Sequence, residues 1–160
     1  MRPRWQLYHR ADDQRRRRHL DRPVTDRAAA RDLAHAFIAA VREGHLPDSL
    51  LTDDMTGWIT TGGTVSRAAY QGMIASLKQM LDGPIEMTVD AITAEDDRVV
   101  IEAHSQARLV NGESYANTYV YVLRVRDGRF CSIAEHYNAL VAREKLVPLM
   151  KQLNSEGKMP

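Results

Sequence analysis

The sequence has little cysteine and no long apolar segment, and each absence excludes a class of protein. Cys131 is the single cysteine among 160 residues, so neither an internal disulfide nor a Cys-x-x-Cys metal pair can form. A lone thiol is typical of reducing compartments, which predicts a cytoplasmic protein. No apolar run approaches the ~18 residues of a membrane helix. No apolar segment follows Arg2 and Arg4, so a secretory signal is not expected. Together with the lack of a long apolar run, this predicts no membrane partner.

Charge is unevenly divided along the chain. Residues 1–22 hold eight arginines and three aspartates, a net +5, whereas residues 23–160 hold 14 basic and 18 acidic residues, a net −4. The run Arg15–Arg18 has the pattern of a segment that contacts nucleic acid or an anionic surface, and Trp5, Leu7 and Tyr8 also suit docking on a partner subunit. We interpret residues 1–24 as a flexible, solvated leader, so nucleic acid is not an expected partner.

The hydrophobic pattern predicts helices before strands. A first helix follows a cap at Thr25 or Asp26 and ends at Gly44, because glycine readily adopts a left-handed conformation. A short helix is expected over 48–53 and a strand over 55–60. Apolar residues of the first helix recur at helical spacing: Ala30, Leu33, Ala34, Phe37, Ile38 and Val41.

A third helix is expected after a break at residues 61–64. Ser66 is its predicted cap, and Gly83-Pro84 is its predicted end. Its apolar stripe consists of Tyr70, Met73, Ile74, Leu77 and Leu81.

The second half of the chain is rich in alternating, β-branched and aromatic residues. Asn111-Gly112 and Asp127-Gly128 are typical two-residue hairpin turns, and Glu95–Asp97 forms a third turn. A closing helix begins near Ala139 and is disturbed at Pro148. The predicted strands cover 85–93, 98–110, 114–125 and 130–138. Early helices followed by an antiparallel meander predict an α+β domain whose bent sheet and helices enclose one pocket.

Three stretches, taken in order, resemble the NTF2-like superfamily, and within it the SnoaL-like and ketosteroid-isomerase-like group. The first is the opening helix with Leu50–Asp54. The second is Gly112–Tyr119. The third is Arg126–Phe130 followed by Ala134–Asn138. The resemblance covers about residues 26–146.

This resemblance implies a cone-shaped fold over residues 25–148, with a C-terminal tail at 149–160. Members of the group include isomerases, dehydratases, polyketide cyclases and epoxide hydrolases, together with non-catalytic binding modules. Dimers through the outer sheet face are common in it, so a homodimer and a small hydrophobic molecule are the expected partners. No cofactor is implied.

The resemblance also implies site residues. Alignment with the epoxide-hydrolase branch places Glu135 at a catalytic carboxylate, whereas the Arg–Asp pair of that branch is replaced by Glu102 and His104. The dehydratase branch uses a histidine, a carboxylate and tyrosines, so His104 and Glu135 are the predicted catalytic residues. A carboxylate within hydrogen-bond reach would fix the tautomer of the histidine and support its charged form. The predicted substrate-binding residues are Trp58, Leu77, Glu102, Gln106, Asn117, Tyr119 and Tyr137.

Several candidates keep simpler interpretations. Trp58 is equally compatible with a core position, and Tyr119 and Tyr121 with packing. His136 has the opposite strand parity and is assigned to the surface or a dimer interface. Cys131 is expected to be a small buried residue, and no compact metal-binding motif is present. The sequence therefore predicts a cofactor-independent dehydratase or isomerase, with a non-catalytic ligand-binding or dimeric assembly module as the alternative.

Overall fold

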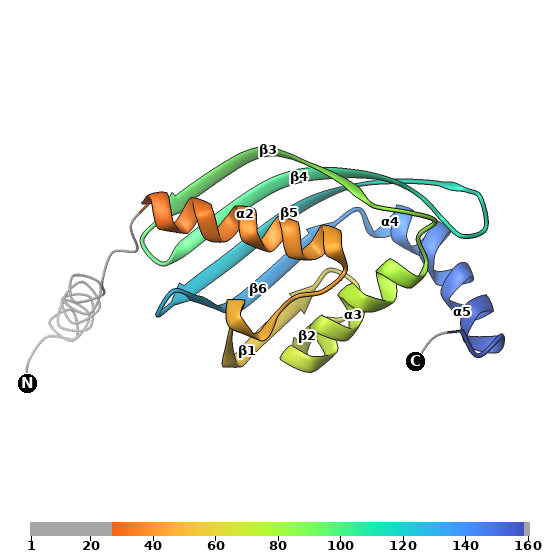
Figure 1. Cartoon of the computed structure of the whole chain (residues 1–160), viewed down its shortest axis with the longest axis horizontal. Coiled ribbons are helices and arrows are strands. Elements are labelled where there is room, and N and C mark those ends of the chain that lie inside the picture. The colour runs from red at the N-terminus through yellow and green to blue at the C-terminus, as the bar shows by residue number, and fades with distance from the viewer. Residues whose placement is uncertain (1–26, 159–160) are drawn as a thin grey trace, which may run out of the picture.

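The computed structural model describes residues 27–158 (Figure 1). The arginine-rich leader and the predicted caps Thr25 and Asp26 lie outside these residues. In chain order the elements are α2 (Arg27–Glu43), the 3-10 helix η1 (Asp48–Leu50), β1 (Leu51–Ile59), β2 (Gly63–Ser66), α3 (Arg67–Gln79), β3 (Glu86–Glu95), β4 (Arg98–Arg108), β5 (Ser114–Arg126), β6 (Arg129–Tyr137), α4 (Ala139–Val141), the π-helix η2 (Ala142–Leu146) and α5 (Val147–Ser155).

Six strands form one curved sheet in the order β2-β1-β6-β5-β4-β3. Neighbouring strands are antiparallel except β1 and β6, which are parallel. The expected α+β class and the β3–β6 meander are confirmed. Strand β2 was not predicted, because the glycines at 62 and 63 indicated only a break; Gly63 in fact pairs with Ile59 across a tight turn. Between residues 27 and 158, no helix is long and apolar enough to cross a membrane.

The helices lie on one face of the sheet (Figure 1). Helix α2 packs on β3 and β4, and α3 packs on β1 and β2. Gly44 ends α2 with a φ of 69°, as predicted, and Ser66 Oγ accepts a hydrogen bond from the backbone N–H of Ala69 at the start of α3. Helix α3 ends at Gln79, before the predicted stop, because Leu81 instead forms a β-bridge with Leu109.

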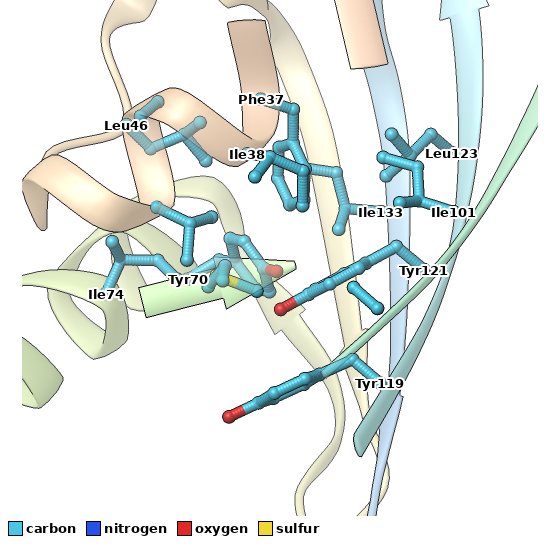
Figure 2. Close-up of a cluster of buried hydrophobic side chains, with 14 of the residues drawn as sticks. Phe37, Ile38, Leu46, Tyr70, Ile74, Ile101, Tyr119, Tyr121, Leu123 and Ile133 are labelled. Carbon is cyan, nitrogen blue, oxygen red and sulfur yellow. The ribbon is translucent and has the colours of Figure 1, made fainter. Parts of the chain in front are cut away.

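The core lies between these helices and the concave face of the sheet (Figure 2). Phe37 of α2 makes edge-to-face contacts with Tyr121 at 5.0 Å and Phe130 at 5.8 Å between ring centroids. Ile101 and Ile133 are fully buried on the same sheet face. Aromatic contacts of this geometry add to the free energy gained by burying their surface, so α2 is held firmly against β5 and β6.

The turn at Asn111-Gly112 differs from the prediction and changes the register of β4 against β5. Only Gly112 has a positive φ, of 85°, whereas a two-residue turn of the predicted type requires it at both positions. The backbone N–H of Leu109 donates to Glu113 O at 2.8 Å, which leaves three residues in the loop. A two-residue loop would pair His104 with Tyr119, but the observed loop pairs Ala103 with Tyr119. A shift of one residue turns every β4 side chain to the opposite face.

The hairpin between β5 and β6 has the predicted two-residue turn, with φ of 53° at Asp127 and 71° at Gly128. Beyond it, Val125 pairs with Phe130 and Arg124 pairs with Ser132, so Cys131 is the extra residue of a β-bulge. Cys131 is therefore half-buried at a strand irregularity, not buried in the core as expected.

The C-terminal segment is more helical than predicted. Pro148 lies in the first turn of α5, where its missing N–H removes no helical hydrogen bond. Leu149 and Leu153, placed in a tail by the sequence, are buried on this helix. The π-helix η2 connects α4 to α5 without an intervening loop.

Candidate functional site

An apolar cavity of about 520 Å³ lies between the sheet and the helices α3, α4 and α5. Its mouth is at α4–η2, since the lining residue Leu140 is 66% exposed. Glu135 and Arg143 are the charged side chains that reach it. The lining residues are Ile59, Thr61, Met73, Ile74, Leu77, Met80, Tyr115, Tyr119, Glu135, Tyr137, Ala139, Leu140, Ala142, Arg143, Leu146, Val147 and Met150.

Glu135 on β6 is the acidic group of the cavity. Its side chain is only 7% exposed, and burial raises the pKa of the carboxyl to about 7, because a low-dielectric environment disfavours the ionised form. Hydrogen bonds from Tyr70 and Tyr121 oppose part of this increase by stabilising the charge. The carboxyl can thus be either protonated or ionised near neutral pH, which suits it to donate and accept protons.

Tyr70 of α3 orients this carboxyl. Its hydroxyl donates to Glu135 Oε2 at 2.8 Å, and its ring is fully buried. The ring lies so close to β1 that a Cβ on Gly57 would be 2.8 Å from Tyr70 Cδ2. Glycine at this strand position is what allows the approach. Burial raises the pKa of the Tyr70 hydroxyl well above its ordinary value, so it stays a hydrogen-bond donor.

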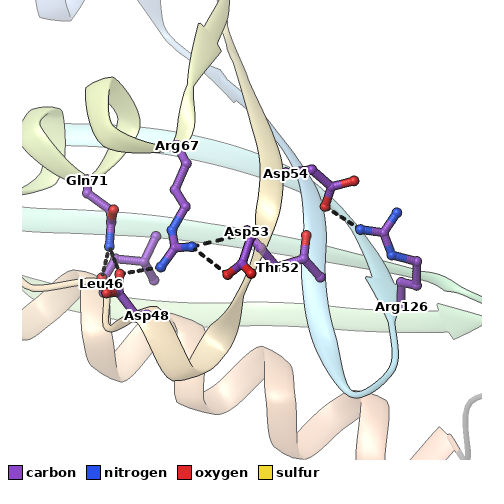
Figure 3. Close-up of polar contacts among 8 residues, drawn as sticks. All are labelled: Leu46, Asp48, Thr52, Asp53, Asp54, Arg67, Gln71 and Arg126. Atoms are coloured by element: carbon purple, nitrogen blue, oxygen red, sulfur yellow. Dashed lines mark hydrogen bonds and ion pairs between the residues drawn. The ribbon is translucent and has the colours of Figure 1, made fainter.

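Polar contacts anchor the first turns of α3 and thereby place Tyr70 (Figure 3). Arg67 forms ion pairs with Asp48 and Asp53. Gln71 donates to Asp48 Oδ1 at 2.9 Å and to Leu46 O at 2.8 Å. Hydrogen bonds from Gln71 and Arg67 lower the pKa of Asp48, so these contacts persist well below neutral pH. Surface pairs of this kind contribute little stability individually; here they fix the position of the helix on η1 and β1.

A second set of hydroxyls lies along β4 and β5. Tyr115 and Tyr119 hydroxyls are 3.0 Å apart, and Ser105 Oγ is 3.2 Å from Tyr119. Asn117 Nδ2 donates to Tyr115 at 3.1 Å. The amide of Asn117 is itself oriented, because its oxygen accepts from the backbone N–H groups of Thr118 and Asn138. Burial raises the pKa of both tyrosines, so they present neutral hydroxyls to the cavity.

The structure brings together several residues of the predicted site. Leu77, Tyr119, Glu135 and Tyr137 line the cavity. Asn117 is buried behind it and reaches it through Tyr115. Tyr119 also stacks on Tyr121, with ring planes 6° apart (Figure 2). These residues share the concave face because Tyr121 pairs with Glu135, and Tyr119 with Tyr137, across β5 and β6.

The expected pair between His104 and Glu135 is not formed. His104 lies on the outer face of the sheet, where its Nδ1 is 2.9 Å from Asp90 Oδ2. Glu102 and Gln106 share that face and are exposed. The extra residue in the β4–β5 loop is the cause, since it turns Ile101, Ala103 and Ser105 inward instead.

Trp58 is also absent from the cavity. It packs on His136 with ring centroids 4.8 Å apart, and it remains 37% exposed. Alternation along β1 points Gly57 and Ile59 inward and therefore Trp58 outward. The surface assignment of His136 agrees with its exposed position.

The sequence analysis missed Tyr115 and Arg143 as cavity residues, and Tyr70 as the hydrogen-bond partner of Glu135. Tyr70 was read only as part of an apolar helical stripe, although a buried tyrosine hydroxyl usually requires a partner. Gly57 inside a strand was a second available signal, since such a glycine often marks a close approach. Within residues 27–158 no group of three His, Cys, Asp or Glu side chains could hold a metal ion.

The chain is similar to a known domain family in sequence and to solved structures in fold. A SnoaL-like domain family model matches residues 34–133, and no curated protein matches the sequence. AclR from Streptomyces galilaeus, provisionally named a hydroxylase, is similar with a TM-score of 0.66 and 21% identity over 79% of this chain and 98% of that one. An NTF2-like protein from Anabaena variabilis has a TM-score of 0.61 and 20% identity over 71% and 93%.

A provisionally named isomerase from Bacillus subtilis is also similar, with a TM-score of 0.64 and 18% identity over 74% of this chain and 93% of that one. At such identities the likeness concerns the fold, and it confirms the expected cone-shaped NTF2-like architecture. The family model adds the sequence relationship, since it spans most of the part of the chain that the structure describes. This chain therefore belongs to the SnoaL-like domain family.

Proposed function

We propose that this protein is a cofactor-independent enzyme that transfers a proton on a hydrophobic carbonyl or hydroxyl compound, as a dehydratase or an isomerase does. One observation carries the proposal: the carboxyl of Glu135 has a pKa of about 7 inside an apolar cavity. A general acid or base is most effective when its pKa is close to the working pH. In the proposed role, Glu135 acts without the histidine partner that the sequence suggested.

The reaction would proceed in two proton transfers. Ionised Glu135 removes a proton from the carbon beside the substrate carbonyl, and the electron pair moves onto the carbonyl oxygen. Hydroxyls of Tyr115 and Tyr119 line the same cavity and would donate to that oxygen as it gains charge. The electron pair then returns from the oxygen and re-forms the carbonyl. In an isomerisation the carbon–carbon double bond shifts as Glu135 protonates a further carbon; in a dehydration a new double bond forms as the C–O bond to a neighbouring hydroxyl breaks and Glu135 protonates that hydroxyl, which departs as water.

A generic carbon acid tests this proposal without knowledge of the substrate. In 5-nitrobenzisoxazole, removal of the ring C–H proton breaks the N–O bond and releases a coloured cyanophenolate. We expect kcat/KM to rise with pH through about 7, the pKa of Glu135. Glu135→Gln should lower kcat/KM by about 100-fold or more.

Two further variants complete the experiment. His104→Gln, on the outer face, is the matched control and should stay within about twofold of wild type. Tyr70→Phe removes a hydrogen bond that lowers the Glu135 pKa, so the midpoint of the pH profile should move upward. Equal rates for wild type and Glu135→Gln would contradict the enzyme and favour the ligand-binding module.

We further propose that a second copy of this chain covers the outer face of the sheet. We also propose that the protein is cytoplasmic, where Cys131 stays reduced. Trp58 is 37% and Val120 is 39% exposed on the outer face, and the helices between residues 27 and 158 lie on the opposite face (Figure 1). A symmetric dimer brings the same apolar patch against itself. Sedimentation equilibrium should show a dimer that Val120→Asp dissociates; a monomeric wild type would contradict this proposal.

A further inference from the structure

The mouth of the cavity carries an unused positive charge. Arg143 lies on η2 and lines the cavity, and its side chain is exposed to solvent. Among residues 27–158 no carboxylate pairs with it, although its neighbour Lys145 pairs with Glu113 at 3.0 Å and with Glu144 at 3.9 Å. Arg143 therefore has no ion-pair partner among the described residues, and its guanidinium is available to a ligand.

Arg143 is not the counter-ion of the buried carboxyl either. The pKa of Glu135 is set by burial and by the hydroxyls of Tyr70 and Tyr121. The two charges therefore act separately at the same cavity, one buried on the sheet and the other exposed on the C-terminal helices. Apolar side chains from α3, η2 and α5 line the space with them, among them Leu77, Leu146 and Met150.

The backbone at Arg143 is unusual as well. Residues Ala142–Leu146 form a π-helix between α4 and α5, and single π-turns are rare and are found frequently at functional sites. Arg143, Leu146 and Val147 all line the cavity from this segment and from the start of α5. A charged side chain is thereby presented among apolar ones at the mouth.

We propose that Arg143 binds a carboxylate of the ligand, so that the cavity accepts an amphipathic acid. This inference rests on the proposed function and defines its substrate class. The apolar body of the ligand occupies the cavity with its reacting carbon toward Glu135, and its carboxylate remains at the mouth. A guanidinium recognises a carboxylate through two parallel hydrogen bonds, which fixes the direction in which the ligand enters.

Two probes that differ in charge test the inference: 2-naphthoate and its neutral amide, 2-naphthamide. Calorimetric titration of the full chain should show about five- to tenfold tighter binding of the acid. Arg143→Gln should reduce this preference to about one while leaving 2-naphthamide affinity unchanged. Arg31→Gln, an exposed arginine on α2 outside the cavity, is the matched control and should keep the preference. Raising the salt concentration should weaken only 2-naphthoate binding to the proteins that retain Arg143.

The outcomes separate this inference from the proposed function. Binding of both probes with equal affinity, or a preference that survives Arg143→Gln, overturns the role of Arg143 and leaves the role of Glu135 untouched. Failure of both probes to bind overturns the inference together with the cavity as a ligand site. Loss of proton transfer in Glu135→Gln with the acid preference intact supports both.

Discussion

The two faces of the same sheet differ in what surrounds their polar side chains. On the concave face, Glu135 is buried among tyrosine hydroxyls and burial moves its pKa to about 7. On the outer face, His104 is half-exposed and pairs with Asp90 in contact with solvent. Histidine is the residue type more often associated with proton transfer near neutral pH. The comparison shows that the environment of a side chain, and not only its type, decides whether its pKa is moved toward neutrality.

Adjacent residues of β4 give the largest expected contrast between the faces. Ile101 is fully buried on the concave side, and Glu102 is exposed on the other. Ile101→Ala should lower the free energy of unfolding by about 3 kcal/mol, because it removes buried methyl groups and leaves a cavity. Glu102→Ala should change it by less than about 0.5 kcal/mol. Chemical denaturation measures both. Similar effects at the two positions would show that the β4 register is wrong.

The second contrast between the two faces is how the free energy of unfolding depends on pH. Because the Glu135 pKa is raised in the folded state, from 4.5 to about 7, its ionisation disfavours folding increasingly as pH rises through this interval. Below pH 4.5 both states are protonated and the cost vanishes; above pH 7 it is complete. Glu135→Gln should therefore raise the free energy of unfolding by about 3 kcal/mol at pH 8 and by only about 1 kcal/mol at pH 5.5.

Glu102→Gln is the control for that measurement, since this carboxyl is exposed. Its effect on the free energy of unfolding should be small at both pH values. A gain at Glu135 that does not depend on pH would indicate a carboxyl with an ordinary pKa. That result would remove the main support for the catalytic role that we propose for Glu135.

The smallest expected effect on stability concerns the loop between β4 and β5, which determines the face of the sheet on which each β4 side chain lies. Gly112 has a φ of 85°, which is unfavourable for residues with a side chain, so Gly112→Ala should cost about 1 kcal/mol. Gly72 lies inside α3 with no neighbour within 4 Å of an added Cβ. Gly72→Ala should instead stabilise by about 0.5–1 kcal/mol, because alanine favours helix. Equal effects in thermal unfolding would contradict the loop geometry that turns His104 outward.

Much of the fold could be predicted from local patterns. Apolar residues at helical spacing predicted α2, the cap at Ser66 predicted the start of α3, and alternating runs predicted the meander. Strand β2 could not be predicted in this way. It is four residues long and exists because β1 turns back and pairs with it, a tertiary contact that leaves little trace in the residues themselves.

The candidate site was harder to predict because its composition depends on strand register. The bulge at Cys131 and the three-residue loop at Val110–Gly112 each insert one residue beyond simple alternation. Glu135 and Tyr119 both lie on the concave face, whereas His104, which was expected beside Glu135, lies on the outer face. The bulge breaks the alternation of β6, since the buried residues Phe130 and Ile133 are three positions apart. The extra loop residue leaves the alternation within β4 and β5 intact, so it cannot be detected from either strand alone.

By itself the sequence determined the α+β class and the order of most elements, whereas only the family resemblance suggested that Glu135 and Tyr119 face inward. The class and the element order are therefore the features that local patterns explain. These features follow from hydrophobic periodicity and turn residues, which act over a few positions. Tertiary structure alone decided that Glu135 meets Tyr70 and not His104, and that Arg143 shares its cavity. These contacts depend on how α3 and the C-terminal helices pack on the sheet. Docking is set by the whole set of packing contacts, and burial then determines the pKa of the carboxyl.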